Sequence, residues 1–325
     1  MATRPSSEDS PAVELSAVIV GAAHGEPQVL VVRSGKSGLD ALPSGPLESA
    51  HHTLEAGLRS WVERQTSQPL GYVEQLYTFG DRDRTAVHAG SRRPLSIGYL
   101  ALARELKPGG DSGTAWRSWY QYFPWEDWRG GKPAMLAQVE VQLRRWTSGA
   151  TGAERRARQE RARAAFALGG GPWSEERTLE RYELLYETGL APEAQRDRRR
   201  SPLARESPVK GLSMFSDHRR MLATAIARLR GKIKYRPVAF ELMPATFTFL
   251  QLQRAVEGLS GLRLHKPNFR RLVEAQGLIE ETGQVASERA GRPARLLRYR
   301  REMLERPVQG AGLPVAKAAT RRGKR

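Results

Sequence analysis

The sequence contains no cysteine, which excludes disulfide bonds and thiolate chemistry. No apolar run approaches the ~18 residues that span a bilayer, so we expect no transmembrane helix and no membrane partner. Met1–Pro11 lacks the basic and apolar regions of a signal peptide and is expected to be a disordered leader over residues 1–12. The sequence also lacks a P-loop, a G-x-G-x-x-G motif and any His–carboxylate pairing that would predict a metal site. These absences favour a cytoplasmic protein without bound metal or cofactor.

The net positive charge is high and is concentrated in one part of the chain. The formal net charge is +18, and residues 201–325 hold 26 Lys and Arg against 10 Asp and Glu. Charge concentrated in this way is typical of a protein that binds a phosphate backbone. A solvated, disordered basic tail would account only for residues 307–325.

Strand patterns surround one helical pattern in the N-terminal third. We expect paired strands at Val13–Val20 and Gln28–Arg33, and further strands at Gly71–Phe79 and Leu95–Ala103. Between them, apolar residues at helical spacing predict a helix from about Glu48 to Gln65. This order predicts a mixed α/β domain over residues 13–106.

Residues 107–207 differ in composition and are expected to form a helical insert and a linker. Four of the seven tryptophans lie within thirteen residues of this region: Trp116, Trp119, Trp125 and Trp128. Such rings could stack on nucleobases, but tryptophans this close together more often pack an insert onto its own domain or a dimer partner. A helical pattern covers Met135–Leu168 with a break near residues 149–152. The arginine run Arg196–Arg200 predicts a disordered linker.

The region 208–306 shows the pattern of a winged helix-turn-helix domain. A helix is expected at His218–Ile233, a short strand at Val238–Leu242, and a second helix begins at Thr248, which forms a capping box with Gln251. A third helix, about Lys266 to Gln276, has an apolar face, formed by Phe269, Leu272 and Val273, and a charged face. Two strands, Leu278–Glu281 and Arg295–Tyr299, follow as a hairpin.

In this arrangement the third helix enters the major groove of DNA. Arg270 and Arg271 are the expected base readers because a guanidinium can contact guanine at two acceptors. Asn268 could pair with adenine or with a phosphate. The remaining expected DNA contacts are Lys266 on the helix and Arg289, Arg292 and Arg295 on the hairpin. Alternatively, these arginines only solvate the exposed face of a small domain.

Two long segments, Pro244–Glu274 (PATFTFLQLQRAVEGLSGLRLHKPNFRRLVE) and Gly291–Arg300 (GRPARLLRYR), resemble the C-terminal domain of Nudix-related transcriptional regulators of NAD metabolism. The segments His218–Pro244, Gln75–Arg84 (QLYTFGDRDR) and Ser96–Leu102 (SIGYLAL) are similar too. The resemblance implies an α+β chain with an N-terminal Nudix-like α/β sandwich, a helical insert and a C-terminal winged helix. It departs at His265, where an aspartate is expected to cap the recognition helix.

The Nudix hydrolase motif, G-x5-E-x7-R-E-U-x-E-E-x-G-U, supplies carboxylates that hold a divalent metal over a pyrophosphate. When the first glycine of the motif is aligned with Gly45, the chain matches the motif at Arg59, Trp61 and Glu63. It departs from the motif at His51, Ser60, Arg64 and Thr66. Ser60 and Arg64 replace two of the three helix carboxylates, and Arg64 would repel a cation. We therefore expect no catalysis.

Regulators of this family bind NAD-derived nucleotides, so the resemblance implies an effector such as ADP-ribose. By position, the ligand-binding candidates are Arg33, Phe79, Asp81 and Arg84. Alternatively, Phe79 belongs to the core and the loop charges are solvated. The resulting hypothesis is a cytoplasmic, homodimeric repressor that binds a double-stranded DNA operator under nucleotide control. Two alternatives stay open: a Nudix-type pyrophosphohydrolase with an accessory nucleic-acid-binding domain, and an architectural or RNA-binding protein without ligand control.

Overall fold

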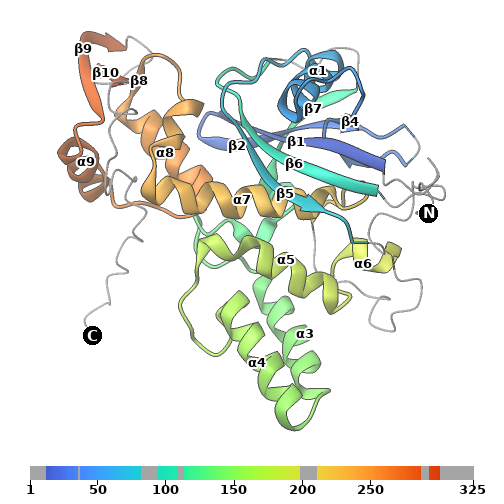
Figure 1. Cartoon of the computed structure of the whole chain (residues 1–325). Coiled ribbons are helices and arrows are strands. Elements are labelled where there is room, and N and C mark those ends of the chain that lie inside the picture. The colour runs from blue at the N-terminus through green and yellow to red at the C-terminus, as the bar shows by residue number, and fades with distance from the viewer. Residues whose placement is uncertain are drawn as a thin grey trace, which may run out of the picture.

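The computed structural model describes residues 12–35, 37–81, 94–107, 113–197, 211–286 and 293–300. The predicted basic tail, residues 307–325, and all but the last residue of the predicted leader, residues 1–12, lie outside these ranges. Figure 1 shows a sheet covered on both faces, a projecting pair of helices and a C-terminal unit beside the sheet.

The first body of the described residues is a seven-stranded mixed sheet. Its central order is β3-β2-β1-β6-β5, with β4 paired to β1 and β7 paired to β2. The strands are β1 (Ala12–Ala23), β2 (Glu26–Arg33), β3 (Asp40–Ala41), β4 (Ser44–Pro46), β5 (Val73–Phe79), β6 (Pro94–Leu102) and β7 (Thr114–Ser118). The β1 and β6 strands run parallel, and the other pairs are antiparallel.

Both faces of this sheet are buried, so β1 is apolar at successive positions rather than alternate ones. Leu15 and Ile19 point to one core together with Leu58 and Val62 of helix α1 (Leu54–Thr66). Val18, on the opposite face, joins the larger core formed with the insert and the C-terminal helices. Helix α1 begins later than the sequence predicted, because Thr53 caps it by accepting a hydrogen bond from the backbone N–H of Ala56 at 3.0 Å.

The insert is largely helical, and most of its aromatic residues are buried in the core. Its helices are α3 (Leu136–Ser148), α4 (Gly152–Phe166), α5 (Thr178–Glu187) and α6 (Pro192–Asp197), with short 3-10 helices at Trp119–Gln121, Pro124–Glu126 and Glu175–Arg177. Trp119 and Trp125 are fully buried, so neither presents a face on which a nucleobase could stack. The strand β7, which carries Trp116, extends the sheet beyond the predicted boundary at residue 106.

Arg196 corrects the prediction that Arg196–Arg200 is entirely a disordered linker. It lies in α6, and its guanidinium donates hydrogen bonds of 2.8 Å to the backbone oxygens of Met214 and Ser216. These bonds fix the segment that leads into the next helix. Residues 198–200 lie outside the described ranges.

The C-terminal unit is a winged helix. It comprises α7 (His218–Tyr235), a 3-10 helix (Val238–Leu242), β8 (Phe247–Thr248), α8 (Phe249–Ser260), α9 (Lys266–Ala275), β9 (Ile279–Ala286) and β10 (Ala294–Tyr299). We call the β9–β10 hairpin the wing. The strand predicted at Val238–Leu242 is wrong: β10 takes β8 and β9 as its neighbours, and Phe240 and Met243 instead close local turns by donating to Pro237 and Phe240.

Helix α7 joins the two bodies. The sequence assigned it to the winged helix, yet it packs on β1, β5 and β6 of the sheet as well as on α5 and α8. Ten of its residues, including Leu222, Ile226 and Leu229, are buried. The winged helix therefore shares one continuous core with the sheet and the insert.

A second junction lies between α8 and the turn that joins β1 to β2. Gly258 of α8 lies so close to this turn that a Cβ on it would overlap the backbone oxygen of Gly25. Tyr120 donates a hydrogen bond of 2.5 Å from its hydroxyl to the backbone oxygen of Gly258. Close packing of backbone against backbone holds α8 against the sheet.

Candidate nucleic-acid interface and ligand sites

The helix-turn-helix begins with a fully formed capping box. The Thr248 hydroxyl accepts from the backbone N–H of Gln251 at 3.2 Å, and the Gln251 side chain accepts from the backbone N–H of Thr248 at 2.7 Å. Helix α8 ends at Gly261, whose φ of 72° favours glycine. The predicted start of this helix is confirmed.

Helix α9 presents an apolar and a charged face as predicted, except that Leu272, which the sequence placed on the apolar face, is 37% exposed. Phe269 and Val273 are buried against the rest of the winged helix. The predicted DNA contacts Lys266, Asn268, Arg270 and Arg271 are all exposed on the outside of α9. His265 occupies the N-cap without a side-chain cap hydrogen bond, as its departure from the family pattern suggested.

The cations of α9 differ in their surroundings. Arg270 donates to Glu274 at 2.8 Å, one turn further along the helix, and its guanidinium lies 5.6 Å from the centre of the Phe249 ring. Within the described part of the chain, Lys266, Asn268 and Arg271 form no side-chain hydrogen bond or ion pair. Arg271 is therefore the arginine most available to an incoming ligand.

The wing has its own ion pairs. Arg295 donates to Glu281 across the hairpin at 2.6 Å, and Arg298 and Arg300 pair with Glu280. These pairs reduce the positive charge that the wing presents. Arg289 and Arg292, also predicted as phosphate contacts, lie outside the described residues.

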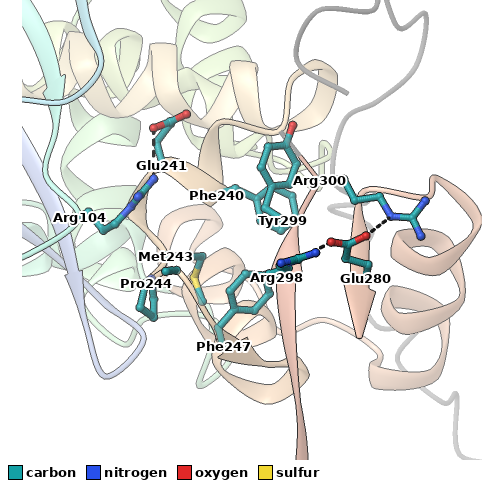
Figure 2. A pocket seen from close by; sticks show the side chains of 11 residues that line it. Arg104, Phe240, Glu241, Met243, Pro244, Phe247, Glu280, Arg298, Tyr299 and Arg300 are labelled. Atoms are coloured by element: carbon teal, nitrogen blue, oxygen red, sulfur yellow. Dashed lines mark hydrogen bonds and ion pairs between the residues drawn. The ribbon is translucent and has the colours of Figure 1, made fainter. Parts of the chain in front are cut away.

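A pocket of about 370 Å³ lies where the wing meets the sheet domain. Figure 2 shows Phe240 and Tyr299 along its wall, and their rings stack 4.4 Å apart. Arg104, from the sheet side, pairs with Glu241 at 3.8 Å. Sequence reasoning did not identify this pocket, because its lining comes from segments that are distant along the chain.

The four predicted ligand-binding residues do not form one cluster. Arg33 is exposed at the end of β2, whereas Phe79 and Asp81 lie at the end of β5, and β1 and β6 separate these two strands. Phe79 is 1% exposed, so the stacking role expected of its ring does not fit this arrangement. Asp81 pairs with Arg220 of α7, and Arg84 lies outside the described residues.

Tyr77 is an aromatic residue of this region that sequence reasoning missed. Its ring is 58% exposed and meets the Phe79 ring edge-on, with the centroids 5.3 Å apart. Alternation along β5 would have identified it, since Tyr77 and Phe79 are two positions apart and share a face. The bulge in this strand lies before Tyr77, between Gln75 and Tyr77, and leaves that alternation intact.

The helix that carries the Nudix motif in hydrolases is α1. Arg59 donates to Glu55 at 2.9 Å and to the backbone oxygen of Leu70 at 2.9 Å, so it ties the helix to the following loop. Arg64 lies 4.0 Å from the centre of the Trp61 ring. Within the described ranges, no group of three or more histidine or acidic side chains is placed to hold a metal ion.

A buried ion cluster joins the insert to the winged helix. Glu126 accepts from Arg181 of α5 at 2.5 Å and from Arg230 of α7 at 2.6 Å, and all three side chains are fully buried. Burial by itself would raise the pKa of Glu126, but the two guanidinium groups more than offset it and hold this pKa below its usual value. Arg230 also donates to the backbone oxygen of Leu259 in α8 at 3.0 Å.

Comparison with known proteins identifies the C-terminal unit. Residues 239–299 match the family model described as the NrtR DNA-binding winged helix domain. A curated protein of Acinetobacter baylyi, the ADPR responsive transcriptional repressor NtrR, is 42% identical over 89 residues. That match covers 27% of this chain and 35% of the relative, so the chain matches about a third of the relative's length.

Two solved structures extend the likeness to the whole fold. Shewanella oneidensis NrtR in complex with a 27mer DNA has a TM-score of 0.53 at 19% identity, covering 89% of this chain and 93% of that one. A MutT/nudix family protein from Enterococcus faecalis has a TM-score of 0.52 at 13% identity, covering 92% and 90%.

The fold and the matched domain define a class of protein, in which a Nudix-like sheet domain is joined to a winged helix. The particular proteins that this chain resembles are the NrtR regulators. The resemblance and the fold class that the sequence predicted are therefore confirmed. None of the helices in the described ranges has the length and apolar composition needed to cross a bilayer.

Proposed function

We propose that this protein is a sequence-specific transcriptional repressor that binds double-stranded operator DNA. The observation that carries the proposal is the exposed face of α9, on which Lys266, Asn268 and Arg271 project, without a partner among the described residues, from a winged helix of the NrtR type. Guanidinium and amide groups on such a helix are the groups that read base edges in the major groove. Arg270 contributes to DNA binding once its guanidinium leaves Glu274 and contacts the DNA.

The second part of the proposal is a small effector, ADP-ribose or a related NAD-derived nucleotide. It is supported by the Acinetobacter relative, which is an ADPR responsive repressor. The Nudix-like sheet domain is the proposed sensor, with Arg33 and Asp81 as candidate contacts and Tyr77 as the exposed ring nearest to Phe79. Because α7 packs on the sheet and on α8, a ligand that moves α7 would also move the winged helix.

We propose further that the sheet domain is not an enzyme and that no metal or cofactor is resident. Ser60 and Arg64 stand on α1 where the hydrolase motif has carboxylates, and Arg64 is exposed on the same helix as Glu63. A cation placed there would meet a guanidinium. Incubation of the full chain with ADP-ribose and Mg²⁺ or Mn²⁺ should release no AMP, and metal-dependent release of AMP would favour the pyrophosphohydrolase alternative.

The proposed assembly is a homodimer that acts in the cytoplasm. Two-fold proteins match two half-sites on DNA, which gives a winged-helix repressor a reason to dimerise. Sedimentation of the chain with and without operator DNA tests this: a protomer that stays monomeric on DNA would contradict it.

The central experiment is fluorescence anisotropy on DNA from upstream of the protein's own gene and its neighbours, at fixed salt, with and without ADP-ribose. We expect saturable, sequence-selective binding that ADP-ribose shifts. Arg271→Ala should weaken operator binding by about 1–3 kcal/mol and relax sequence preference. Arg177→Ala is the matched control, since Arg177 is exposed and lies outside the winged helix. Binding that ignores sequence, nucleotide and Arg271 would refute the proposal.

A further inference from the structure

The helices α3 and α4 form a helical hairpin that projects from the body of the molecule, apart from α9 and the wing (Figure 1). Residues 136–166, which make up this hairpin, contain seven arginines and three glutamates. The surplus is local, because the chain before residue 201 is nearly neutral as a whole. The net charge of the whole region therefore gave no sign of the basic surface that the fold forms on this projecting hairpin.

Most of these arginines have no acidic partner among the described residues. Arg158 pairs with Glu154 at 2.5 Å and donates to the backbone oxygen of Trp146, and Arg161 pairs with Glu187 at 2.7 Å. The other five are exposed and form no side-chain hydrogen bond or ion pair with any residue that the structure describes: Arg144, Arg145, Arg155, Arg156 and Arg163.

The exposed face of α4 carries charged side chains but no large apolar side chain. Its only buried residues are Ala162, Ala165 and Phe166, and the positions facing solvent are Arg, Glu, Gln, Ala and Gly. Protein interfaces need a core of large apolar or aromatic side chains, and membrane-surface helices need an apolar face. Helix α4 has neither, whereas a phosphate backbone requires only arrayed cations.

The hairpin is held in a fixed place relative to the winged helix. The backbone oxygen of Ala165, in the last turn of α4, accepts from Arg181 at 3.1 Å. Arg181 binds Glu126, which binds Arg230, which donates to the backbone oxygen of Leu259 at the end of α8. A continuous path of buried hydrogen bonds thus runs from the base of the hairpin to the helix-turn-helix.

From this geometry we infer that the α3–α4 hairpin is a second DNA-binding surface, which contacts the phosphate backbone of duplex DNA outside the segment read by α9. The inference rests on the proposed function, because the duplex that the hairpin contacts is the one that α9 holds. The contact is independent of sequence, since arginines on phosphates carry no base information. The contact increases the affinity for DNA and the salt dependence of binding, but it adds no sequence preference.

The test uses the full chain and a fluorescein-labelled 40-base-pair duplex of random sequence, with anisotropy measured across a range of NaCl concentrations. We compare the wild type with a variant that combines Arg155→Gln, Arg156→Gln and Arg163→Gln. The slope of log Kobs against log salt should become shallower by about 0.9 for each phosphate that the variant no longer neutralises, so by about 1–3 in total. The matched control replaces the same three residues with lysine, which keeps the charge and should keep the slope near that of the wild type.

A second variant, Lys266→Gln with Arg271→Gln, separates the two proposals. If the α9 variant has a shallower slope and the hairpin variant does not, the hairpin inference is refuted while the proposed function stands. If only the hairpin variant has a shallower slope, the hairpin inference stands and the role of α9 fails. The same slopes are measured on a duplex RNA of the same length. A shallower slope of the hairpin variant on RNA alone would overturn the assignment to DNA.

Discussion

Glu126 and Arg230 form an ion pair of 2.6 Å in which both side chains are fully buried, although they lie more than a hundred residues apart in the chain. Arg181 completes the cluster from the other side of the carboxylate, and the Thr178 hydroxyl lies 3.2 Å from the same carboxylate. Backbone oxygens of Glu175 and Leu259 accept further guanidinium protons. This cluster joins three parts of the chain at one point: the insert, α7 and α8.

Replacing the central carboxylate should be costly. Glu126→Gln leaves two buried guanidinium groups without their counter-charge, and we expect the free energy of unfolding to fall by about 3–5 kcal/mol. Urea denaturation followed by tryptophan fluorescence measures the change. Glu154→Gln, which removes the carboxylate of the mostly exposed pair with Arg158, should cost less than about 1 kcal/mol. Equal losses in the two variants would show that the cluster does not anchor the fold.

The same cluster should make the fold sensitive to acid. Glu126, Glu74 and Asp127 all have folded pKa values lowered by arginine or lysine neighbours that outweigh burial. A lowered folded pKa stabilises the protein above the unfolded pKa, which is 4.5 for a glutamate, and that stability is lost as the pH falls toward the folded value. We therefore expect the Tm to fall steeply below about pH 4.5. Glu126→Gln should flatten this fall, and an unchanged profile would contradict the assignment.

The close packing of α8 on the sheet gives a third prediction. In Gly258→Ala the new Cβ overlaps the backbone oxygen of Gly25, and neither backbone position can yield without moving α8. We expect a loss of about 1–3 kcal/mol in the free energy of unfolding. The control is Gly231→Ala in α7, where a Cβ meets open space and alanine should stabilise the helix by about 0.5–1 kcal/mol. If both variants were stabilised, the junction between Gly258 and Gly25 would not be tight.

The fourth prediction concerns the ion pair on the recognition helix. Glu274 holds Arg270 at 2.8 Å and places a negative charge on the face that DNA would approach. Glu274→Gln should therefore tighten DNA binding and steepen its salt dependence by about one phosphate contact, or about 0.9 in the slope. Anisotropy over a salt series measures this, with Glu63→Gln on α1 as the control. Weaker binding of the Glu274 variant would mean that the pair positions Arg270 for DNA.

The local chemistry of the winged helix was readable from the sequence. The capping box at Thr248 and the charged face of α9 are set by residues within a few positions of each other. Such signals depend on helix geometry alone, so the candidate interface on α9 was predicted residue by residue and found exposed as expected. Whether those residues read DNA stays a prediction.

The tertiary structure decided everything that joins distant segments. The Arg220 guanidinium of α7 lies 5.5 Å from the centre of the buried Phe79 ring, and β7 joined the sheet by pairing with residues 28–32 of β2. The buried ion cluster could not be predicted, since no spacing relates Glu126 to Arg230, and burial of charge is visible only once a fold surrounds it. The basic hairpin was not evident from the sequence either, because the net charge of residues 1–200 as a whole is close to zero. The sequence by itself determined the capped start of α8 and the charged face of α9, because those depend on near neighbours. Packing decided which surfaces meet and which charges stay exposed, because those depend on the whole chain.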